Sequence, residues 1–323
     1  MSRTTPRRTT LLPGPDVLTV PATVLTVLAT TLTGCSAPDG GASADRPPAR
    51  ARTSPAAPPT GSGAAPSAPR TSPSPPRTRP APTRTPSARG GTRWRPRPGL
   101  AWQWQLDGRV EPSADVPVYD IDGFENTAAD VARLHREGRK VICYVNVGAW
   151  EDFRPDRDAF PRSVLGRTNG WEGERWLDIR RISVLGPIME RRFDMCRDKG
   201  FDAVEPDLME GYGNDTGFPL TAADQLRYNR MIARLAHERG MSVGLKNDLP
   251  QIPQLVDDFD FAVNEECAQY GECAELTPFV EAGKAVFHVE YAEPAGEFCA
   301  ASRRLKLSSM RKKPELGVWR DPC

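Results

Sequence analysis

The sequence predicts a (β/α)8 TIM-type barrel in residues 99–323 of the 323-residue chain. Three observations predict this fold. Short, almost continuous apolar runs recur along the region, as expected for parallel strands that are buried on both faces. Helical patterns separate most of these runs, and a glycine follows each of the longer helices before the next strand. Seven or eight such units in 225 residues match a barrel, whose usual size is about 250 residues.

A doubly wound open sheet is the alternative fold. Such a sheet would be expected to carry a glycine-rich phosphate turn after its first strand, and no such turn is present in the sequence. The barrel is therefore the favoured architecture.

In the first half of the region, apolar runs predict strands and amphipathic patterns predict helices. The first helix has Val131 and Leu134 on one face and ends at Gly138, and the second ends at Gly200. The expected elements are strands at 102–106, 116–121, 140–147 and 201–206, with helices at 126–137 and 188–199.

In the second half, a helix is expected where Thr221 can act as N-cap, Asp224 lies in the first turn and Gly240 follows the last turn. Apolar runs again predict the strands. The expected elements are the helix at 222–239, strands at 241–247, 259–265 and 284–291, and LGVW at 316–319 as the eighth strand.

Residues 1–35 have the features of an export signal. Arg3, Arg7 and Arg8 precede an apolar run that ends in Leu32-Thr33-Gly34-Cys35, which resembles a bacterial lipobox. The resemblance implies that Cys35 is lipidated and anchors the protein to the outer face of the cell membrane. The alternative is an ordinary cleaved signal in which the cysteine is coincidental.

Residues 36–98 contain sixteen of the 33 prolines and eleven arginines, a composition that predicts a disordered tether. The remaining 225 residues carry 29 basic and 39 acidic residues, so the net charge of +1 for the whole chain hides a domain of −10. An acidic domain argues against nucleic acid as a partner and allows a cationic one.

Six cysteines remain once Cys35 is set aside. An even number in an exported domain predicts three disulfides, for which fifteen pairings are possible. In one assignment, Cys267–Cys273 closes a short loop and Cys299–Cys323 ties down the C-terminus. The two cysteines that are left over then form Cys143–Cys196. No C-x-x-C pair occurs and the chain has three histidines, so we expect no metal site and no cofactor.

Polar residues concentrate at the ends of the predicted strands, where a barrel carries its functional groups. Helix capping would explain one or two of them, but not Glu265 and Glu290, which lie inside strand-like runs. Trp104 of the first strand is an aromatic candidate for stacking on a sugar. The other candidates for substrate binding or catalysis are Asp120, Asp122, Tyr144, Asn146, Glu205, Asp207, Lys246, Asn247, Glu265 and Glu290.

Two carboxylates that face a cleft, without a Ser–His pair or a metal-ligand cluster, are typical of glycoside hydrolysis. One acid protonates the leaving oxygen and the other attacks the sugar or activates water. We expect Lys246 either to hold a neighbouring carboxylate ionised or to serve as a structural ion-pair partner.

Several motifs together resemble glycoside hydrolase family 114, the endo-α-1,4-polygalactosaminidase family of (β/α)8 barrels. They are WQWQL, the Asp120–Gly123 turn, VEPD with the following GYGNDTGFPLTAADQLRYN, GLKND, DFDFAVNEEC and YGEC. The resemblance implies hydrolysis of α-1,4-linked galactosamine polymers, with Asp207 as nucleophile and Glu265 as general acid/base. This chain reads EPDLMEGY where relatives tend to read EPDN-x-DGY, so Leu208 and Glu210 depart from the pattern.

The expected partner is thus a cationic amino-sugar polysaccharide, bound by a monomer that carries a lipid anchor. Asp120, Asp122 and Glu290 are candidates for holding the ammonium groups of such a polymer. Two alternatives remain open at the level of the sequence. One is a non-catalytic polysaccharide-binding surface module on a barrel scaffold, and the other is a hydrolase for a different α-linked sugar.

Overall fold

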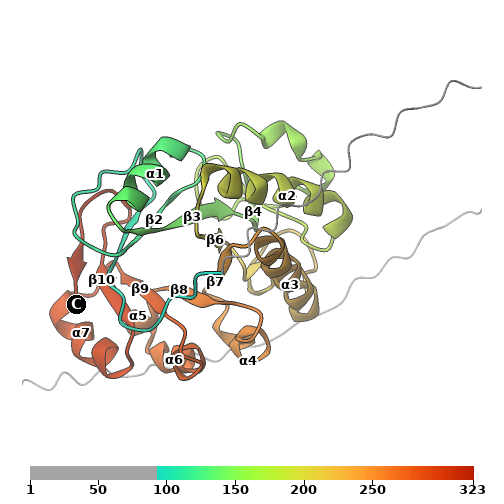
Figure 1. Cartoon of the computed structure of the whole chain (residues 1–323). Coiled ribbons are helices and arrows are strands. Elements are labelled where there is room, and N and C mark those ends of the chain that lie inside the picture. Colours follow the sequence, from blue (N-terminus) through green and yellow to red (C-terminus); the bar gives the residue numbers. More distant parts are fainter. Residues whose placement is uncertain (1–92) are drawn as a thin grey trace, which may run out of the picture. The chain divides into compact units, whose positions relative to one another are not determined.

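The structure is a computed structural model that describes residues 93–323 (Figure 1). The predicted signal segment, its Cys35 and the linker as far as residue 92 lie outside the described residues. Within residues 93–323, no helix is long and apolar enough to cross a membrane.

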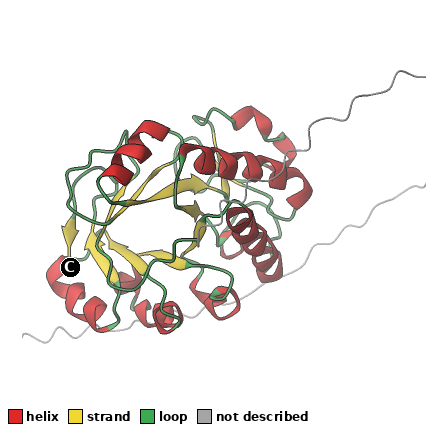
Figure 2. Cartoon of the chain, viewed as in Figure 1, coloured by secondary structure: helices red, strands yellow, loops and turns green. Residues whose placement is uncertain are grey.

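Eight parallel strands form one curled sheet, and each strand pairs with the next one along the sheet. Figure 2 shows the strands as a ring with the helices outside it. The fold is therefore the predicted TIM-type barrel. The strands are β1 (Trp102–Gln105), β2 (Val118–Asp122), β3 (Lys140–Asn146), β6 (Ala203–Asp207), β7 (Ser242–Lys246), β8 (Phe261–Glu265), β9 (Val286–Glu290) and β10 (Ser308–Arg311).

Within residues 93–323, β1 and β10 do not pair through backbone hydrogen bonds, and other hydrogen bonds join the two ends of the sheet. The Trp102 indole donates to the Ser308 carbonyl at 2.8 Å, and the Leu106 amide donates to the Leu316 carbonyl at 3.0 Å. A ninth strand, β11 (Asp321–Pro322), pairs antiparallel with β10.

The helices pack outside the sheet, and two of the longest begin with a capping box. Thr127 and Asp130 form the box of α1, and Thr221 and Asp224 form that of α3, which confirms the predicted cap. The helices are α1 (Ala128–Arg136), α2 (Ile182–Lys199), α3 (Ala222–Glu238), α4 (Ile252–Leu255), α5 (Cys267–Tyr270), α6 (Thr277–Glu281) and α7 (Ala295–Arg304).

Helix α2 begins six residues earlier than the sequence analysis expected. Pro187 lies inside it, although proline usually ends or kinks a helix. The helix continues through the proline because Leu185, Ile188 and Met189 are buried in the core around it.

Between β3 and α2 the chain makes an excursion that the sequence analysis did not predict. Its hairpin pairs β4 (Ala149–Glu151) antiparallel with β5 (Glu174–Trp176). Short 3-10 turns lie in this excursion and in the loops after later strands, at η1 (Arg157–Ala159), η2 (Arg162–Val164), η3 (Gly211–Gly213), η4 (Leu249–Gln251) and η5 (Cys273–Leu276).

The eighth strand is Ser308–Arg311, so the expectation of a strand at 316–319 was wrong. Leu316 has a φ of 49°, a left-handed conformation that cannot continue a strand, and Pro314 precedes it. Side chains of the barrel hold the segment as a loop instead: Lys312 donates to the Gly317 carbonyl at 2.6 Å and Gln103 donates to the Val318 carbonyl at 2.7 Å.

Residues 93–98, which the sequence analysis placed in the disordered linker, lie against the barrel. The Arg93 guanidinium contacts Asp260 Oδ1 at 3.1 Å, and the Pro96 carbonyl accepts from the Ala285 amide at 2.9 Å. Trp94 packs against the apolar residues inside the barrel. These contacts show that the folded domain begins before residue 99.

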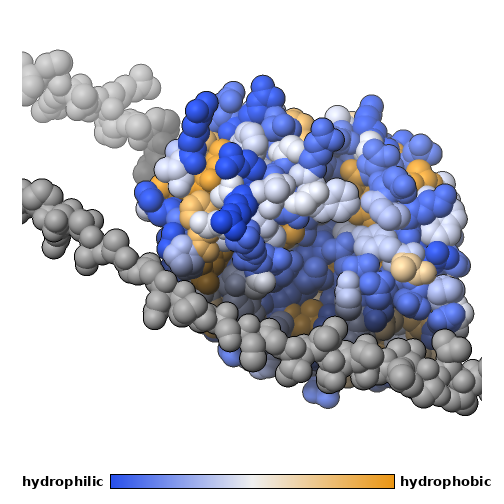
Figure 3. All heavy atoms as spheres, turned by 180° about the vertical axis from the view of Figure 1, so that it is seen from behind, coloured by the Kyte–Doolittle hydropathy of each residue, from blue (hydrophilic) through white to orange (hydrophobic). Residues whose placement is uncertain are grey.

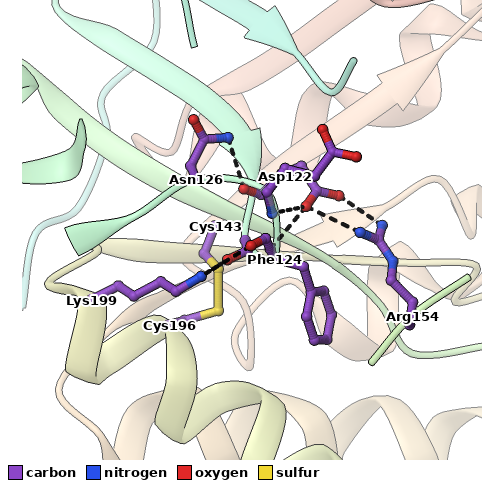
Figure 4. Close-up of a disulfide and its surroundings, with 9 residues drawn as sticks. Asp122, Phe124, Asn126, Cys143, Arg154, Cys196 and Lys199 are labelled. Atoms are coloured by element: carbon purple, nitrogen blue, oxygen red, sulfur yellow. Dashed lines mark hydrogen bonds and ion pairs between the residues drawn. A yellow bond between two sulfur atoms is a disulfide. The ribbon is translucent and has the colours of Figure 1, made fainter. Parts of the chain in front are cut away.

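Three disulfides connect the elements, in the pairing that the sequence analysis singled out among the fifteen. Cys143–Cys196 ties β3 to α2 (Figure 4). Cys267–Cys273 closes the turn around α5, and Cys299–Cys323 ties α7 to the segment after β11.

The core has two layers. The barrel interior is filled by large side chains that include Trp102, Phe261, Phe287 and Met310, and a larger apolar layer lies between the strands and the helices. The face of the domain in Figure 3 is mostly hydrophilic, with its hydrophobic residues in separate patches.

Candidate active site

A cleft of about 1270 Å³ opens at the C-terminal ends of the parallel strands. Twelve carboxylate side chains line it, against two cationic ones, Arg154 and Lys246. Of the predicted residues, the lining includes Trp104, Asp122, Tyr144, Asp207, Lys246, Asn247 and Glu265. The predicted Asp120, Asn146, Glu205 and Glu290 are not among the lining residues.

Lys246 lies at the centre of the site, at the end of β7. Its Nζ is 2.8 Å from Asp207 Oδ1, 3.1 Å from Glu265 Oε2 and 3.4 Å from Glu205 Oε1. The three carboxylates come from the two strands on either side, β6 and β8. One ammonium group therefore bridges the two predicted catalytic carboxylates.

Asp207 is held as a carboxylate by its neighbours. Burial alone would raise its pKa, but the Lys246 ammonium and the Tyr144 hydroxyl hold the pKa of Asp207 below its usual range. Tyr144 Oη donates to Asp207 Oδ2 at 2.8 Å, and Lys246 occupies the other oxygen. The side chain is thus ionised and fixed in orientation at the cleft.

Glu265 is the more accessible of the pair, with about a quarter of its side chain exposed to the cleft. The Tyr291 hydroxyl donates to Glu265 Oε1. The side chain of Asn247 accepts from the Glu265 amide at 3.0 Å and from Asn264 Nδ2 at 3.2 Å, so it fixes the end of β8 against the end of β7.

Two further acids, Glu205 and Asp120, are buried behind the residues that line the cleft. The Trp104 indole donates to Glu205 Oε2 at 2.9 Å, and Lys246 Nζ lies 5.1 Å from the centre of the Trp104 ring. Burial raises the pKa of Glu205, and burial together with the Glu205 charge raises that of Asp120 well above its usual value. Both oxygens of Asp120 are buried without a hydrogen-bond partner within residues 93–323, and neither acid lines the cleft, so both lie out of reach of a substrate.

Glu290 and Asn146 also have supporting positions. Glu290 Oε1 accepts from the Ala268 amide at 2.7 Å and lies 2.8 Å from His288 Nε2. Asn146 Oδ1 accepts from the Ala149 amide at 2.8 Å, which positions the start of β4. Both side chains are buried, so the predicted substrate contact of Glu290 and Asn146 is not what the structure shows.

Asp122 lies at the edge of the cleft, but its oxygens are already engaged (Figure 4). The Arg154 guanidinium donates to Oδ1 at 3.1 Å and to Oδ2 at 2.7 Å. The amides of Phe124 and Glu125 donate to Oδ1, each at 2.8 Å. Asp122 therefore anchors Arg154, and this leaves its oxygens less available to a substrate ammonium group than the sequence analysis expected.

Arg154 belongs to a buried ion network that the sequence analysis missed. It also pairs with Glu151 at 2.8 Å, and Arg192 of α2 contacts Glu151 at 3.4 Å and Asp156 at 2.8 Å. These residues lie in or face the excursion after β3, whose short elements have no clear period in the sequence. Only the high density of charged residues there could have indicated the network.

Three further residues of the cleft follow directly on predicted positions. Tyr291 and Asp248 come one and two residues after the ends of β9 and β7, and Glu210 comes three residues after the end of β6. Burial raises the pKa of Glu210 and of Asp248 to about 8 in each case. Reading further into the loops after the strands would have found all three.

A group of metal-ligating residue types also lies near this end of the barrel, formed by Cys267, Cys273 and His288. The two sulfurs are joined in a disulfide, and the His288 nitrogens contact Ser309 Oγ and Glu290 Oε1, each at 2.8 Å. These atoms therefore do not offer a set of metal ligands.

The family model of glycoside-hydrolase family GH114 matches residues 83–323. The structure of Ega3 from Aspergillus fumigatus in complex with galactosamine is 40% identical, with a TM-score of 0.69 over 72% of this chain and 98% of that one. The glycoside hydrolase domain of PelA from Pseudomonas aeruginosa is similar in fold alone, at 14% identity and a TM-score of 0.54 over 68% of this chain and 97% of that domain. No curated protein sequence matches this chain.

Proposed function

This chain belongs to glycoside-hydrolase family GH114, and on that premise we propose that it cleaves α-1,4-linked galactosamine-containing polysaccharide internally. In this proposal, Asp207 and Glu265 are the two catalytic carboxylates. The observation that carries it is the Lys246 ammonium, which joins these two side chains at the floor of an acidic cleft.

In the first step, an oxygen of the ionised Asp207 attacks the anomeric carbon of the sugar. Glu265 gives its proton to the glycosidic oxygen as that bond breaks, through an oxocarbenium-like transition state. Water, deprotonated by Glu265, then attacks the anomeric carbon of the glycosyl–Asp207 ester and releases the product. Each step leaves Asp207 and Glu265 ready for the next one.

The separation of the two carboxylates supports a retaining outcome. Because Lys246 Nζ is 2.8 Å from Asp207 Oδ1 and 3.1 Å from Glu265 Oε2, these oxygens lie within about 6 Å of each other. Retaining enzymes place their carboxyl groups about 5–5.5 Å apart, whereas inverting enzymes need about 6.5–9.5 Å to admit a water molecule.

The charge of the cleft supports a cationic substrate. Even with Glu210 and Asp248 neutral, acidic side chains outnumber the two cations of the lining, which creates a negative potential and concentrates a polyamine such as deacetylated polygalactosamine. Ega3, which is 40% identical to this chain, has been solved in complex with galactosamine.

The rim of the cleft supports binding of a long chain. Phe153, Trp171 and Tyr270 line it with 58%, 64% and 65% of their surface exposed. Exposed aromatic rings in a carbohydrate cleft stack on the apolar faces of sugar units. A polymer that stacks on several of them would be cut internally.

We further propose that the protein is a lipoprotein on the outer face of the cell membrane, attached through Cys35 and carried by the proline-rich linker. We also propose that it acts as a monomer. Substitution of Cys35→Ser should release the protein from the membrane fraction of expressing cells. Retention of this variant in the membrane fraction would contradict the lipid anchor.

The substrate is tested by incubating the purified full-length protein with α-1,4-polygalactosamine and following the products by mass spectrometry. A range of oligosaccharides early in the reaction is expected, since an endo-acting enzyme cuts at many positions. NMR of the first products should show the α-anomer before mutarotation. Release of single sugars alone would contradict endo action, and an initial β-anomer would contradict the role of Asp207 as nucleophile.

A further inference from the structure

Two carboxylates of the cleft have no partner for one of their oxygens. Glu210 follows β6 and Asp248 follows β7, and both line the cleft on the same side as Asp207 and Lys246. Glu210 Oε2 and Asp248 Oδ1 are buried and make no hydrogen bond, and Asp248 as a whole is 2% exposed. Within residues 93–323, neither side chain takes part in an ion pair, unlike Asp207 and Glu265, which share Lys246.

The surroundings of Asp248 show that its position is built rather than incidental. Asn229 of α3 donates to Asp248 Oδ2 at 2.9 Å and to the Met209 carbonyl at 3.0 Å, so it links the loops after β6 and β7. Asp248 itself has a φ of 49°, a left-handed conformation that is unfavourable for a residue with a side chain. Such strain persists where the fold imposes it, and it is concentrated at functional sites.

Within residues 93–323, no cationic side chain forms an ion pair with Glu210 or Asp248. Burial raises the pKa of Asp248 to about 8, although Tyr212 and Asn229 favour its ionised form. Burial also raises the pKa of Glu210 to about 8, and the charges of Asp207 and Asp248 raise it further. An ammonium group placed between the two carboxyls would offset these effects and occupy both free oxygens.

We propose that Glu210 and Asp248 form a subsite that binds the ammonium group of a galactosamine unit; this inference rests on the proposed function. Each free oxygen accepts one N–H bond of the ammonium group. An N-acetylated sugar carries a neutral amide with one N–H in the same place, so it cannot satisfy both carboxylates. The subsite therefore selects for deacetylated units.

The position of the subsite beside Asp207 also fits the chemistry of an amino sugar. The amine of galactosamine is on the carbon next to the anomeric carbon, where positive charge develops in the transition state. An ammonium group there opposes that charge. Two carboxylates next to the ammonium reduce the repulsion, and they act most strongly in a cleft from which water is partly excluded.

The residues that the sequence analysis suggested for this task are unsuitable. Arg154 and two backbone amides engage the oxygens of Asp122, while Asp120 and Glu290 lie beneath the floor of the cleft. Glu210 and Asp248 are the pair that combines a place in the cleft with free, buried oxygens.

The test uses the full-length protein with the substitutions Glu210→Gln and Asp248→Asn. The matched control is Glu281→Gln, which removes one carboxylate charge from the exposed end of α6, outside the cleft. Binding of galactosamine and of N-acetylgalactosamine is measured by NMR titration, and kcat/KM is measured on polygalactosamine and on its N-acetylated form. Because burial already favours the neutral form of both carboxyls, the amide variants are expected to fold, which thermal unfolding checks.

Each of the two variants should weaken galactosamine binding and kcat/KM on polygalactosamine by about tenfold or more, as expected for loss of a charge-assisted hydrogen bond. Values for the acetylated compounds, and all values for Glu281→Gln, should stay within about twofold of the unmodified protein. Unchanged galactosamine binding in both variants, or equal losses on both polymers, would overturn the subsite.

The outcomes also separate the subsite from the proposed function. Galactosamine binding that depends on both residues, in a protein that cleaves neither polymer, would support the subsite and contradict the proposed function. Cleavage of polygalactosamine at an unchanged rate by both variants would leave the proposed function intact and overturn the subsite. Absence of galactosamine binding by the unmodified protein would also overturn it.

Discussion

At the scale of single residues, Lys246 decides the chemistry of the site. It is buried, and its net effect is to keep Asp207 ionised in a place where burial alone would favour the neutral acid. Tyr144 adds to this effect through one hydrogen bond. The charge of Asp207, the proposed nucleophile, therefore depends on a side chain that need not touch the reacting atoms.

Substitution of Lys246→Met should raise the pKa of Asp207. Since the proposed nucleophile acts as a carboxylate, the acid limb of the kcat/KM profile should move to higher pH, with a loss on the order of 100-fold at neutral pH. Tyr144→Phe removes only one hydrogen bond and should shift the limb in the same direction by less. An acid limb that stays in place in Lys246→Met would contradict this role of the lysine.

Asp122 has a structural task, which leads to a different expectation for Asp122→Asn. The substitution leaves the buried Arg154 with one carboxylate partner instead of two, which should lower the free energy of unfolding by about 3 kcal/mol. Urea denaturation measures this loss. Activity on acetylated and deacetylated polymer should fall by the same factor, and a selective loss on the cationic polymer would instead restore Asp122 as a substrate contact.

At the scale of elements, the loop between β10 and β11 is held in place by side chains of the barrel and brings Leu316 into the cleft. Lys312 holds this loop at the Gly317 carbonyl. Burial lowers the pKa of Lys312 to about 7. The side chain that fixes the loop therefore changes its charge near physiological pH.

The shift at Lys312 gives the stability of the domain a pH dependence of known sign. Between pH 7 and the ordinary lysine pKa of about 10.5, the unfolded chain binds a proton that the folded chain does not. The contribution of this residue to stability should therefore rise with pH across that window. Lys312→Met should remove this rise, as followed by urea denaturation at several pH values, and the same slope in the variant would assign it to other groups.

The same loop shows where reading the sequence fails. The run at 316–319 has apolar residues at strand spacing, but the left-handed Leu316 breaks it, and backbone conformation at one residue is not readable from composition. The true strand, SSMR at 308–311, carries two serines and looks polar. Its serines are buried because the last strand of the barrel packs against β9 and α7.

At the scale of the whole molecule, the barrel is what made the central residues predictable. Parallel strands bring their C-terminal ends to one rim, so Asp207, Lys246 and Glu265 could be expected to meet although they are far apart in the chain. The role of Asp122 could not be predicted, because Arg154 is its neighbour only in the folded structure. The contact of Glu290 with His288 was open to prediction, because residues two apart in a strand share a face.

The central claim is that Asp207 and Glu265 carry out hydrolysis, and the most direct test is product formation from polygalactosamine by Asp207→Asn and Glu265→Gln. The unmodified protein and the matched variant Glu281→Gln are measured beside them by mass spectrometry. The account predicts oligosaccharides from the latter two proteins and a loss of at least about 1000-fold in both catalytic variants. Hydrolysis at an unchanged rate by either catalytic variant would contradict the account. If all four proteins bind the polymer and none of them cuts it, the result would favour a binding module.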